Sequence, residues 1–543
     1  MSDVLFTNAR VFTGEEFSAP QSVAVRNGRI LAVGTAAAVP GLLDAASLDV
    51  GSPDAGARTV DLGGKHLMPG FVESHGHPAM FGLTLRQVDV KPAAVQSIEE
   101  IKKAVQIAVI DAQPGEWIQG HGWDETYVLD GRAPTRDDLD EVAPDNPVVL
   151  TRTCGHVILV NSAALRVSGV PEDVADPEGG AFVRDASGRL TGIVQEQSAK
   201  ELIRNPTFTE EQLEEGLVLA QERFNAWGVT TVNDLFSNTA FLGMYRKLDA
   251  DGRLTVRMRP WMGALEKNHF PGHLAPMAAA GISSGFGDDM IRIQGVKLQL
   301  DGSMGGRTAA VCTPFEGTEE TGILLLPRTE DLAAHCRLAA DHDIRMAIHA
   351  IGDAAIGQMF DALDMIDRAE WIAGSRLRIE HCGMPTDAQL DRMAEWNMVA
   401  SSSVGFVYHL GDSYLNVLDA ERAARCYPHR SFIDRGIVAP GNSDVPVTNG
   451  NPWEGIYGAV TRTTRTGQVL DTVQNITLAE AIRAYTLDGA WANFEEDVAG
   501  SIEVGKFADL QVYAENPFEL EPEAWLGLSP ESVWLAGREV YAR

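Results

Sequence analysis

Cysteine, basic residues and long apolar runs are all scarce in this sequence. The five cysteines are odd in number, scattered and never in a CxxC spacing, which predicts free thiols in a reducing compartment and argues against a disulfide framework. Lysine and arginine total 44 against 76 aspartate and glutamate residues, a formal net charge of −32. Nucleic acids and anionic membranes attract basic faces, so this charge argues against both as partners.

No apolar stretch is long enough to cross a membrane. The sequence contains no run of roughly 18 apolar residues free of charge and proline, the minimum for a membrane span. The N-terminal stretch MSDVLFTNARVF also lacks the basic region and apolar core of a secretory signal. We therefore expect a cytoplasmic protein. With 543 residues and 45% apolar side chains, it should form two globular domains. A neutral or cationic small-molecule substrate is compatible with the negative charge.

Two histidines, His75 and His77, follow an apolar run at 67–72. Side chains alternate faces along a strand, so this pair points to one side and can share a metal ion at about 2.0–2.1 Å. The alternative is a surface strand end that happens to be rich in histidine. The apolar run that leads directly into the pair disfavours that alternative, and the segment is a candidate metal anchor.

Short apolar runs with β-branched residues recur along the chain, and helical stretches lie between most of them. Together with the strand that carries the histidine pair they make eight β units. This number predicts a (β/α)8 barrel, whose active site lies at the carboxyl ends of its strands. The other seven expected strands lie at 228–234, 254–261, 291–302, 344–350, 376–382, 397–403 and 437–444.

An inward-facing lysine on the fourth expected strand needs an explanation. Alternation along 291–302 directs Lys297, Gln299 and Asp301 toward the barrel interior. Lys297 is either a structural ion-pair partner or, once carboxylated on its amine, a metal-bridging ligand. The reactive residues at or near expected strand ends are His75, His77, Lys297, His349, His381 and Asp444.

These residues and their surroundings resemble the amidohydrolase superfamily. The phrases DGSMGGRTA, GHVILVNSAAL and GWDE are similar to the YtcJ-like branch, amidohydrolase family 3, which includes N-substituted formamide deformylase. The resemblance covers nearly the whole chain but is weak for substrate, because one scaffold hosts many chemistries. The motifs that carry it are HGH at 75–77, Lys297 in 296–309, IHAIGDAAI at 348–356, IEHC at 379–382 and GNSDVPV at 441–447.

The resemblance implies a small β-sandwich, built from 1–66 and 490–543, beside a metal-dependent barrel at 67–489. The sequence agrees, since Asn27-Gly28 is a strong hairpin signal within 23–34. The gap between the first two barrel strands, at about 83–227, is too long for a connection. We interpret it as an inserted subdomain at the active mouth of the barrel.

Several residues are candidates for substrate binding at that mouth. For those of the insert, the alternative is that they pack its own small core or brace its turns. Arg307 either forms an ion pair or orients substrate. The candidates are Trp123, Tyr127, His156 and Glu196 in the insert, and Asp301 and Arg307 on and after the fourth strand.

Metal-assisted hydrolysis is the mechanism that the resemblance implies, with two divalent ions, expected to be zinc. Hydroxide formed from water between them attacks a carbonyl carbon, and Asp444 passes the proton to the leaving nitrogen. The expected substrate contains an amide C–N bond, as in an N-substituted formamide, an N-acyl amine or a cyclic amide. The implied ligands are His75, His77 and Asp444 for one ion and His349 and His381 for the other, with carboxylated Lys297 as the bridge.

Three other interpretations stay open. A mononuclear-metal deaminase would use the same histidines and Asp444 but would give Lys297 no metal role. A decarboxylase or isomerase could use the same site and would be recognised by its products. A metal-binding regulatory protein without turnover is the non-enzyme alternative, which has no obvious need for Asp444 as a base. A homodimer is compatible with each of these interpretations.

Overall fold

The structure is a computed structural model that describes residues 3–35, 39, 58–91, 94–123, 125, 128–152, 157–177, 180–204, 208–266 and 271–543. It divides into two compact units. The first combines Met1–Pro78 with Gln221–Arg543, and the second is Ala79–Ala220. The second unit overlaps the range of about 83–227 in which we expect an inserted subdomain.

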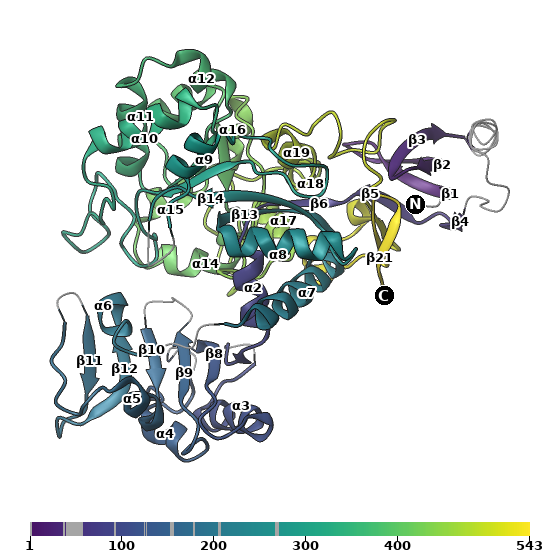
Figure 1. Cartoon of the computed structure of the whole chain (residues 1–543). Helices are drawn as coiled ribbons and strands as arrows, with labels where there is room; N and C mark the ends of the chain where they lie inside the picture. The colour runs from purple at the N-terminus through teal and green to yellow at the C-terminus, as the bar shows by residue number, and fades with distance from the viewer. Residues whose placement is uncertain are drawn as a thin grey trace. The chain divides into compact units, whose positions relative to one another are not determined.

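A parallel sheet of seven strands forms the centre of the first unit and curls into a nearly closed, TIM-like barrel (Figure 1). Every residue of β14 is buried, as expected for a parallel strand that is covered on both faces. In sheet order the strands are β6 (Phe71–Gly76), β13 (Val229–Ser237), β14 (Arg257–Gly263), β15 (Gly295–Gln299), β16 (Met346–Ala350), β17 (Arg378–His381) and β18 (Val399–Ser402).

Helices follow the strands, and their apolar faces pack on the outside of the sheet. Val296 and Leu298 of β15 share one buried cluster with Leu332 and Met359 of the helices, so the alternation predicted for this strand is confirmed. The helices of this unit are α8 (Thr239–Ala250), α9 (Leu274–Ala280), α10 (Thr329–Asp341), α11 (Asp353–Asp364), α12 (Ala369–Gly374), α13 (Asp387–Glu395), α14 (Gly405–Leu415), α15 (Ala420–Arg425), α16 (His429–Asp434), α17 (Pro452–Thr461), α18 (Leu478–Ala484), α19 (Leu487–Ala492) and α20 (Pro522–Trp525), with a 3-10 turn at Pro517–Glu519. Helices α2 (Pro78–Leu85) and α7 (Glu210–Ala226) cross the boundary between the two units.

The eighth expected strand, at 437–444, is not a strand in the structure, and that part of the prediction is wrong. The segment still lies between the two edge strands, because Ala400 N donates to Val438 O and Asp444 N donates to His75 O. Pro440 has no N–H to donate to a ladder. Side chains act in its place, for example Ser74 Oγ, which donates to Gly441 O at 2.7 Å.

Both ends of the chain join one mixed sheet of eight strands. Its N-terminal hairpin turns at Asn27-Gly28 with φ values of 50° and 78°, which confirms the predicted turn. A buried ion pair, Arg257 Nε to Asp509 Oδ2 at 2.6 Å, ties this sheet to barrel strand β14. The strands run β21 (Arg538–Ala542), β20 (Ser532–Leu535), β19 (Leu510–Tyr513), β5 (His66–Pro69), β1 (Val4–Phe12), β2 (Phe17–Arg26) and β3 (Arg29–Gly34), with β4 (Arg58–Asp61) paired to β1.

The second unit is a six-stranded sheet with its own helices and its own apolar core (Figure 1). Strands β11 and β12 form a hairpin, and Gly188 N donates to Asp185 O in its turn. The strands run β11 (Ala181–Arg184), β12 (Leu190–Gln195), β10 (Val157–Val160), β9 (Val148–Arg152), β8 (Ile118–Trp123) and β7 (Val88–Asp89), with helices α3 (Ile98–Asp111), α4 (Arg136–Asp140), α5 (Ser162–Ser168) and α6 (Glu196–Lys200).

Neither a membrane span nor a disulfide is found in the part of the chain that the structure describes. Each helix there is too short or too polar to cross a bilayer. The cysteines described, Cys312, Cys336, Cys382 and Cys426, are all free thiols, as predicted for them.

Candidate metal centre

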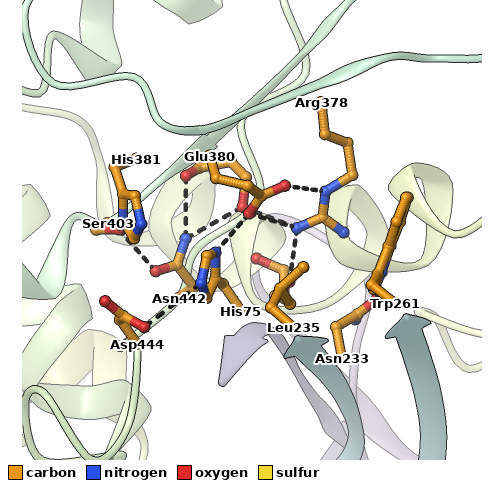
Figure 2. Close-up of polar contacts among 12 residues, drawn as sticks. His75, Asn233, Leu235, Trp261, Arg378, Glu380, His381, Ser403, Asn442 and Asp444 are labelled. Atoms are coloured by element: carbon orange, nitrogen blue, oxygen red, sulfur yellow. Dashed lines mark hydrogen bonds and ion pairs between the residues drawn. The ribbon is translucent and has the colours of Figure 1, made fainter. Parts of the chain in front are cut away.

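Two histidines and an aspartate come together at the carboxyl ends of the barrel strands (Figure 2). His75 lies in β6, His381 ends β17, and Asp444 lies in the irregular segment that follows β18 and α16. One ligand atom from each lies within 4.8 Å of the other two, and all three side chains are buried. The positive φ of His381, 68°, breaks the alternation of β17 at this residue.

Both of these histidines are held in the neutral form. Burial lowers the pKa of His75 well below its usual value, and the nearby charges of Lys297 and His77 add to the effect. Burial and the neighbouring His349 lower the pKa of His381 in the same direction. Neutral imidazole is the form that binds a metal ion, so these side chains need lose no proton to act as ligands.

Asp444 lies between the two histidines of the HGH motif. Its Oδ1 is 3.0 Å from His77 Nε2 and 3.4 Å from His75 Nε2. Burial opposes the charged form of His77, but the hydrogen bond and charge of Asp444 outweigh it and raise the pKa of His77. The other ring nitrogen of His77, Nδ1, lies 2.6 Å from Leu235 O, which fixes the ring.

His349 lies on the next strand, with its ring 4.5 Å from that of His381. Its Nε2 is 3.0 Å from Gly302 O and 3.3 Å from Asp301 Oδ1. From the sequence, we expected His75 and Asp444 to bind one ion and His381 to bind the other. The structure instead places these three residues in one cluster.

Lys297 is fully buried among the same groups. Its charge contributes to the pKa shifts of His75, His381 and Glu380, and its Nζ lies 5.8 Å from the Phe236 ring centroid. The strand register pairs Lys297 with Ala347, two residues before His349. The inward direction expected for this lysine agrees with its position.

A buried carboxylate that the sequence analysis missed holds His75 from behind. Glu380 Oε2 lies 2.5 Å from His75 Nδ1, the ring nitrogen opposite the one that faces Asp444. Arg378 donates to both oxygens of Glu380, at 2.7 and 3.0 Å, and its charge helps to keep the pKa of this buried acid below its usual value. The sequence contained a signal for Glu380. Leu377 and Ile379 are apolar, so alternation along the strand places Arg378 and Glu380 on the inner face.

Glu73 is a second carboxylate missed from the sequence. Its Oε1 accepts from His75 N at 3.0 Å, and its Oε2 accepts from Ser443 Oγ at 2.7 Å, which joins β6 to the segment that carries Asp444. Burial raises the pKa of Glu73 to about 7. Glu73 precedes His75 by two residues, so alternation places its side chain on the same face of the strand as those of His75 and His77. This spacing could have identified it from the sequence.

The expected substrate residues have varied positions. Asp301 is buried and accepts hydrogen bonds from the backbone amides of Ala310, Ile351 and Gly352, so it anchors the loops after β15 and β16. Arg307 is partly exposed and lies 3.8 Å from Glu320, which agrees with the ion-pair alternative.

In the second unit, Trp123 is buried in the unit's core and its indole N–H donates to Leu150 O at 2.9 Å, which favours the packing alternative. Glu196 is exposed at the start of α6. Tyr127 and His156 lie outside the described residues.

The curled parallel sheet and the histidine and aspartate cluster at its strand ends define a barrel-fold metalloenzyme. Residues 58–541 match the model Amidohydro_3, the amidohydrolase family, and the chain belongs to this family. The YtcJ-like, formamide deformylase-like branch proposed from the sequence is confirmed by two relatives.

One relative is N-substituted formamide deformylase of Arthrobacter pascens, 29% identical, with 96% of this chain and 94% of the relative covered. Another is putative amidohydrolase YtcJ of Bacillus subtilis, 26% identical, with 91% and 92% covered. A crystal structure of an uncharacterized metal-dependent hydrolase from Pyrococcus horikoshii matches at a TM-score of 0.78 and 24% identity, over 96% of this chain and 99% of that one, which supports the fold.

Proposed function

We propose that this protein is a metal-dependent hydrolase that cleaves a non-peptide amide C–N bond in an N-substituted formamide, an N-acyl amine or a cyclic amide. The buried cluster of His75, His381 and Asp444 carries the proposal. Relatedness to a formamide deformylase over nearly the whole chain supports the choice of bond.

The donor set fits a divalent metal, and we propose zinc. Two neutral imidazoles and a carboxylate are ligands that zinc accepts at about 2.0–2.2 Å, and their ligand atoms lie within 4.8 Å of one another. When bound, such an ion supplies Lewis acidity and lowers the pKa of water. The Glu380 carboxylate at His75 Nδ1 agrees with the usual support of ligating histidines by hydrogen bonds to their second nitrogen.

Asp444 is the proposed proton carrier. It is buried but remains within hydrogen-bonding distance of His77 Nε2, so its carboxylate can hold a proton taken from water and deliver it to the leaving nitrogen. Glu380 holds the His75 ring so that Nε2 faces Asp444. His77, whose ring is fixed by Leu235 O, holds the Asp444 carboxylate in place through its Nε2.

The finer model has two metal ions bridged by carboxylated Lys297. The buried position of Lys297 among His75, His381 and Glu380 supports it, because a free ammonium there would repel bound cations. Among the described residues one compact group of three possible ligands is found, which favours instead a mononuclear deaminase, our second candidate.

A combined measurement of products and metal content separates these candidates. Purified, metal-replete protein is incubated with formamides, N-acyl amines, cyclic amides and amino-substituted heterocycles. Release of formate or another carboxylate with two metals per chain supports the hydrolase. Release of ammonia from a ring amine with one metal per chain supports the deaminase, and the absence of turnover on every class contradicts both.

Further proposals concern the fold, the cellular location and the oligomeric state of the protein. We propose that the segment 437–444 completes the barrel, that the sheet of both chain ends folds as a β-sandwich, and that the second unit contributes to substrate choice. The protein is proposed to act in the cytoplasm, as a homodimer and on a small molecule. The hydrogen bonds of Val438 and Asp444 to the edge strands support the first point.

A further inference from the structure

A cavity of about 930 Å³ lies at the end of the barrel opposite the metal centre. Its lining includes Gln294, Arg345 and Ser375, which precede strands β15, β16 and β17, whereas the candidate metal ligands lie at or beyond strand carboxyl ends. The volume is in the range of small-molecule sites, roughly 300–1,000 Å³. This cavity therefore belongs to no part of the site described above.

A buried arginine forms part of the cavity wall. Arg345 is 5% exposed, and its guanidinium donates to the carbonyl oxygens of Ser375 and Ala492, both at 2.7 Å, and to Gln294 Oε1 at 2.9 Å. Within the described ranges Arg345 forms no ion pair with a carboxylate, and burial lowers its pKa well below the usual value. A buried cation whose direct contacts are all neutral acceptors is costly, and the more distant charges of Glu380 and Glu495 offset this cost only in part.

The wall also holds polar groups that lack partners. Among the described residues, hydrogen-bond partners are missing for Gln294 Nε2, Ser375 Oγ, Trp371 Nε1 and both amide atoms of Asn493. All four residues line the cavity, and Gln294, Ser375 and Asn493 are at most 8% exposed. Buried polar groups are normally paired, so such a concentration on one wall points to a missing partner.

The unpaired groups are mainly donors. The Gln294 and Asn493 amides and the Trp371 indole each offer an N–H, and the Ser375 hydroxyl can also donate. These atoms are themselves shielded from solvent, and each belongs to a residue of the cavity lining. The ring of Phe494, 45% exposed, stacks at 4.6 Å on Arg345 and adds a flat apolar surface.

We propose that this cavity binds a small organic carboxylate, whose acidic group pairs with Arg345 and the neighbouring donors while its flat body packs on Phe494 and Trp371. The acids of the lining, Asp343, Asp367 and Glu370, are exposed, so solvent screens their charges. The site is separate from the metal centre and does not depend on the proposed function.

Benzoate is the probe, with benzamide as its neutral counterpart, in calorimetric titrations of the full-length protein without added metal. Gly374→Phe fills the cavity, because a Cβ at Gly374 meets no atom within 4 Å, and Gly243→Phe on α8 is the matched control with the same open space. Arg345→Gln removes the charge. We expect Gly374→Phe and Arg345→Gln to weaken benzoate binding by roughly tenfold or more, and Gly243→Phe to leave it unchanged.

Three outcomes would overturn the proposal. They are no benzoate binding to the wild type at millimolar concentration, equal binding of benzamide, and undiminished binding to Gly374→Phe. Gly374→Phe keeps the test valid if Arg345→Gln does not fold, since its side chain points into open space. Metal content and any turnover should be the same in Gly374→Phe and the wild type, because the cavity is at the other end of the strands.

Discussion

Glu380→Gln should weaken metal binding while leaving every proposed ligand in place. The carboxylate lies 2.5 Å from His75 Nδ1, so it orients the ring and makes the opposite nitrogen a stronger electron donor. A glutamine of the same shape retains one weaker, neutral hydrogen bond. It also leaves the guanidinium of Arg378, which is fully buried, without its anionic partner.

The size of the effect follows from the kind of contact that is lost. Replacing the carboxylate behind a ligating histidine typically lowers metal affinity by about 10–100-fold, which equals roughly 1.4–2.7 kcal/mol. Breaking a buried ion pair separately lowers the free energy of unfolding, typically by about 3–5 kcal/mol. The two effects must therefore be measured apart.

A competition titration against a chromogenic zinc chelator measures affinity, and thermal unfolding of the metal-free protein measures stability. The matched control is Glu495→Gln, which breaks another buried pair, Arg259 with Glu495 at 2.9 Å, away from the metal centre. This variant should lose stability but keep the zinc affinity of the wild type. Wild-type affinity in Glu380→Gln, or an equal loss in Glu495→Gln, would refute the positioning role.

Three further predictions concern the proton carrier, the lysine and an acid-sensitive histidine. Asp444→Asn should fold but lose about 10²–10⁴-fold in kcat, as expected for a lost acid–base group, and a rate within a few-fold of wild type would exclude that role. Lys297→Ala should lose activity and regain part of it with added short carboxylic acids, whereas no rescue and one metal per wild-type chain would contradict the bridge. Burial lowers the pKa of His429 to about 4, so only the unfolded chain gains a proton there as the pH falls from about 6.5. Because of this residue, the free energy of unfolding should fall by at most about 1.4 kcal/mol per pH unit between about pH 6.5 and pH 4. Urea unfolding at several pH values should show a weaker loss of stability with acid in His429→Gln than in the wild type. An equal loss in both proteins would disprove this prediction.

The sequence predicts the barrel well where one physical rule acts alone. Alternation identifies the inner face of β15 and hence Lys297, because Val296 and Leu298 need the apolar cover of the helices. The rule fails at 437–444, where Pro440 and side-chain hydrogen bonds replace the ladder. Local pattern could not reveal this, since Ser74, which donates to Gly441 O, lies 367 residues earlier in the chain.

The candidate site was also only partly predictable from the sequence. The metal-binding residue types were visible in the sequence, but the grouping of His75 with His381 depends on the positive φ of His381 and on the closure of the sheet. Alternation places Glu380 on the inner face of its strand but does not show which group it contacts. Its partner, His75, is 305 residues earlier in the chain.

Anomalous diffraction from crystals of the zinc-loaded protein tests the central claim most directly. The account predicts a strong peak at about 2.0–2.2 Å from His75 Nε2, a nitrogen of the His381 ring and a carboxylate oxygen of Asp444. A fully loaded protein whose zinc lies elsewhere, with these three side chains bound only to one another, would contradict it.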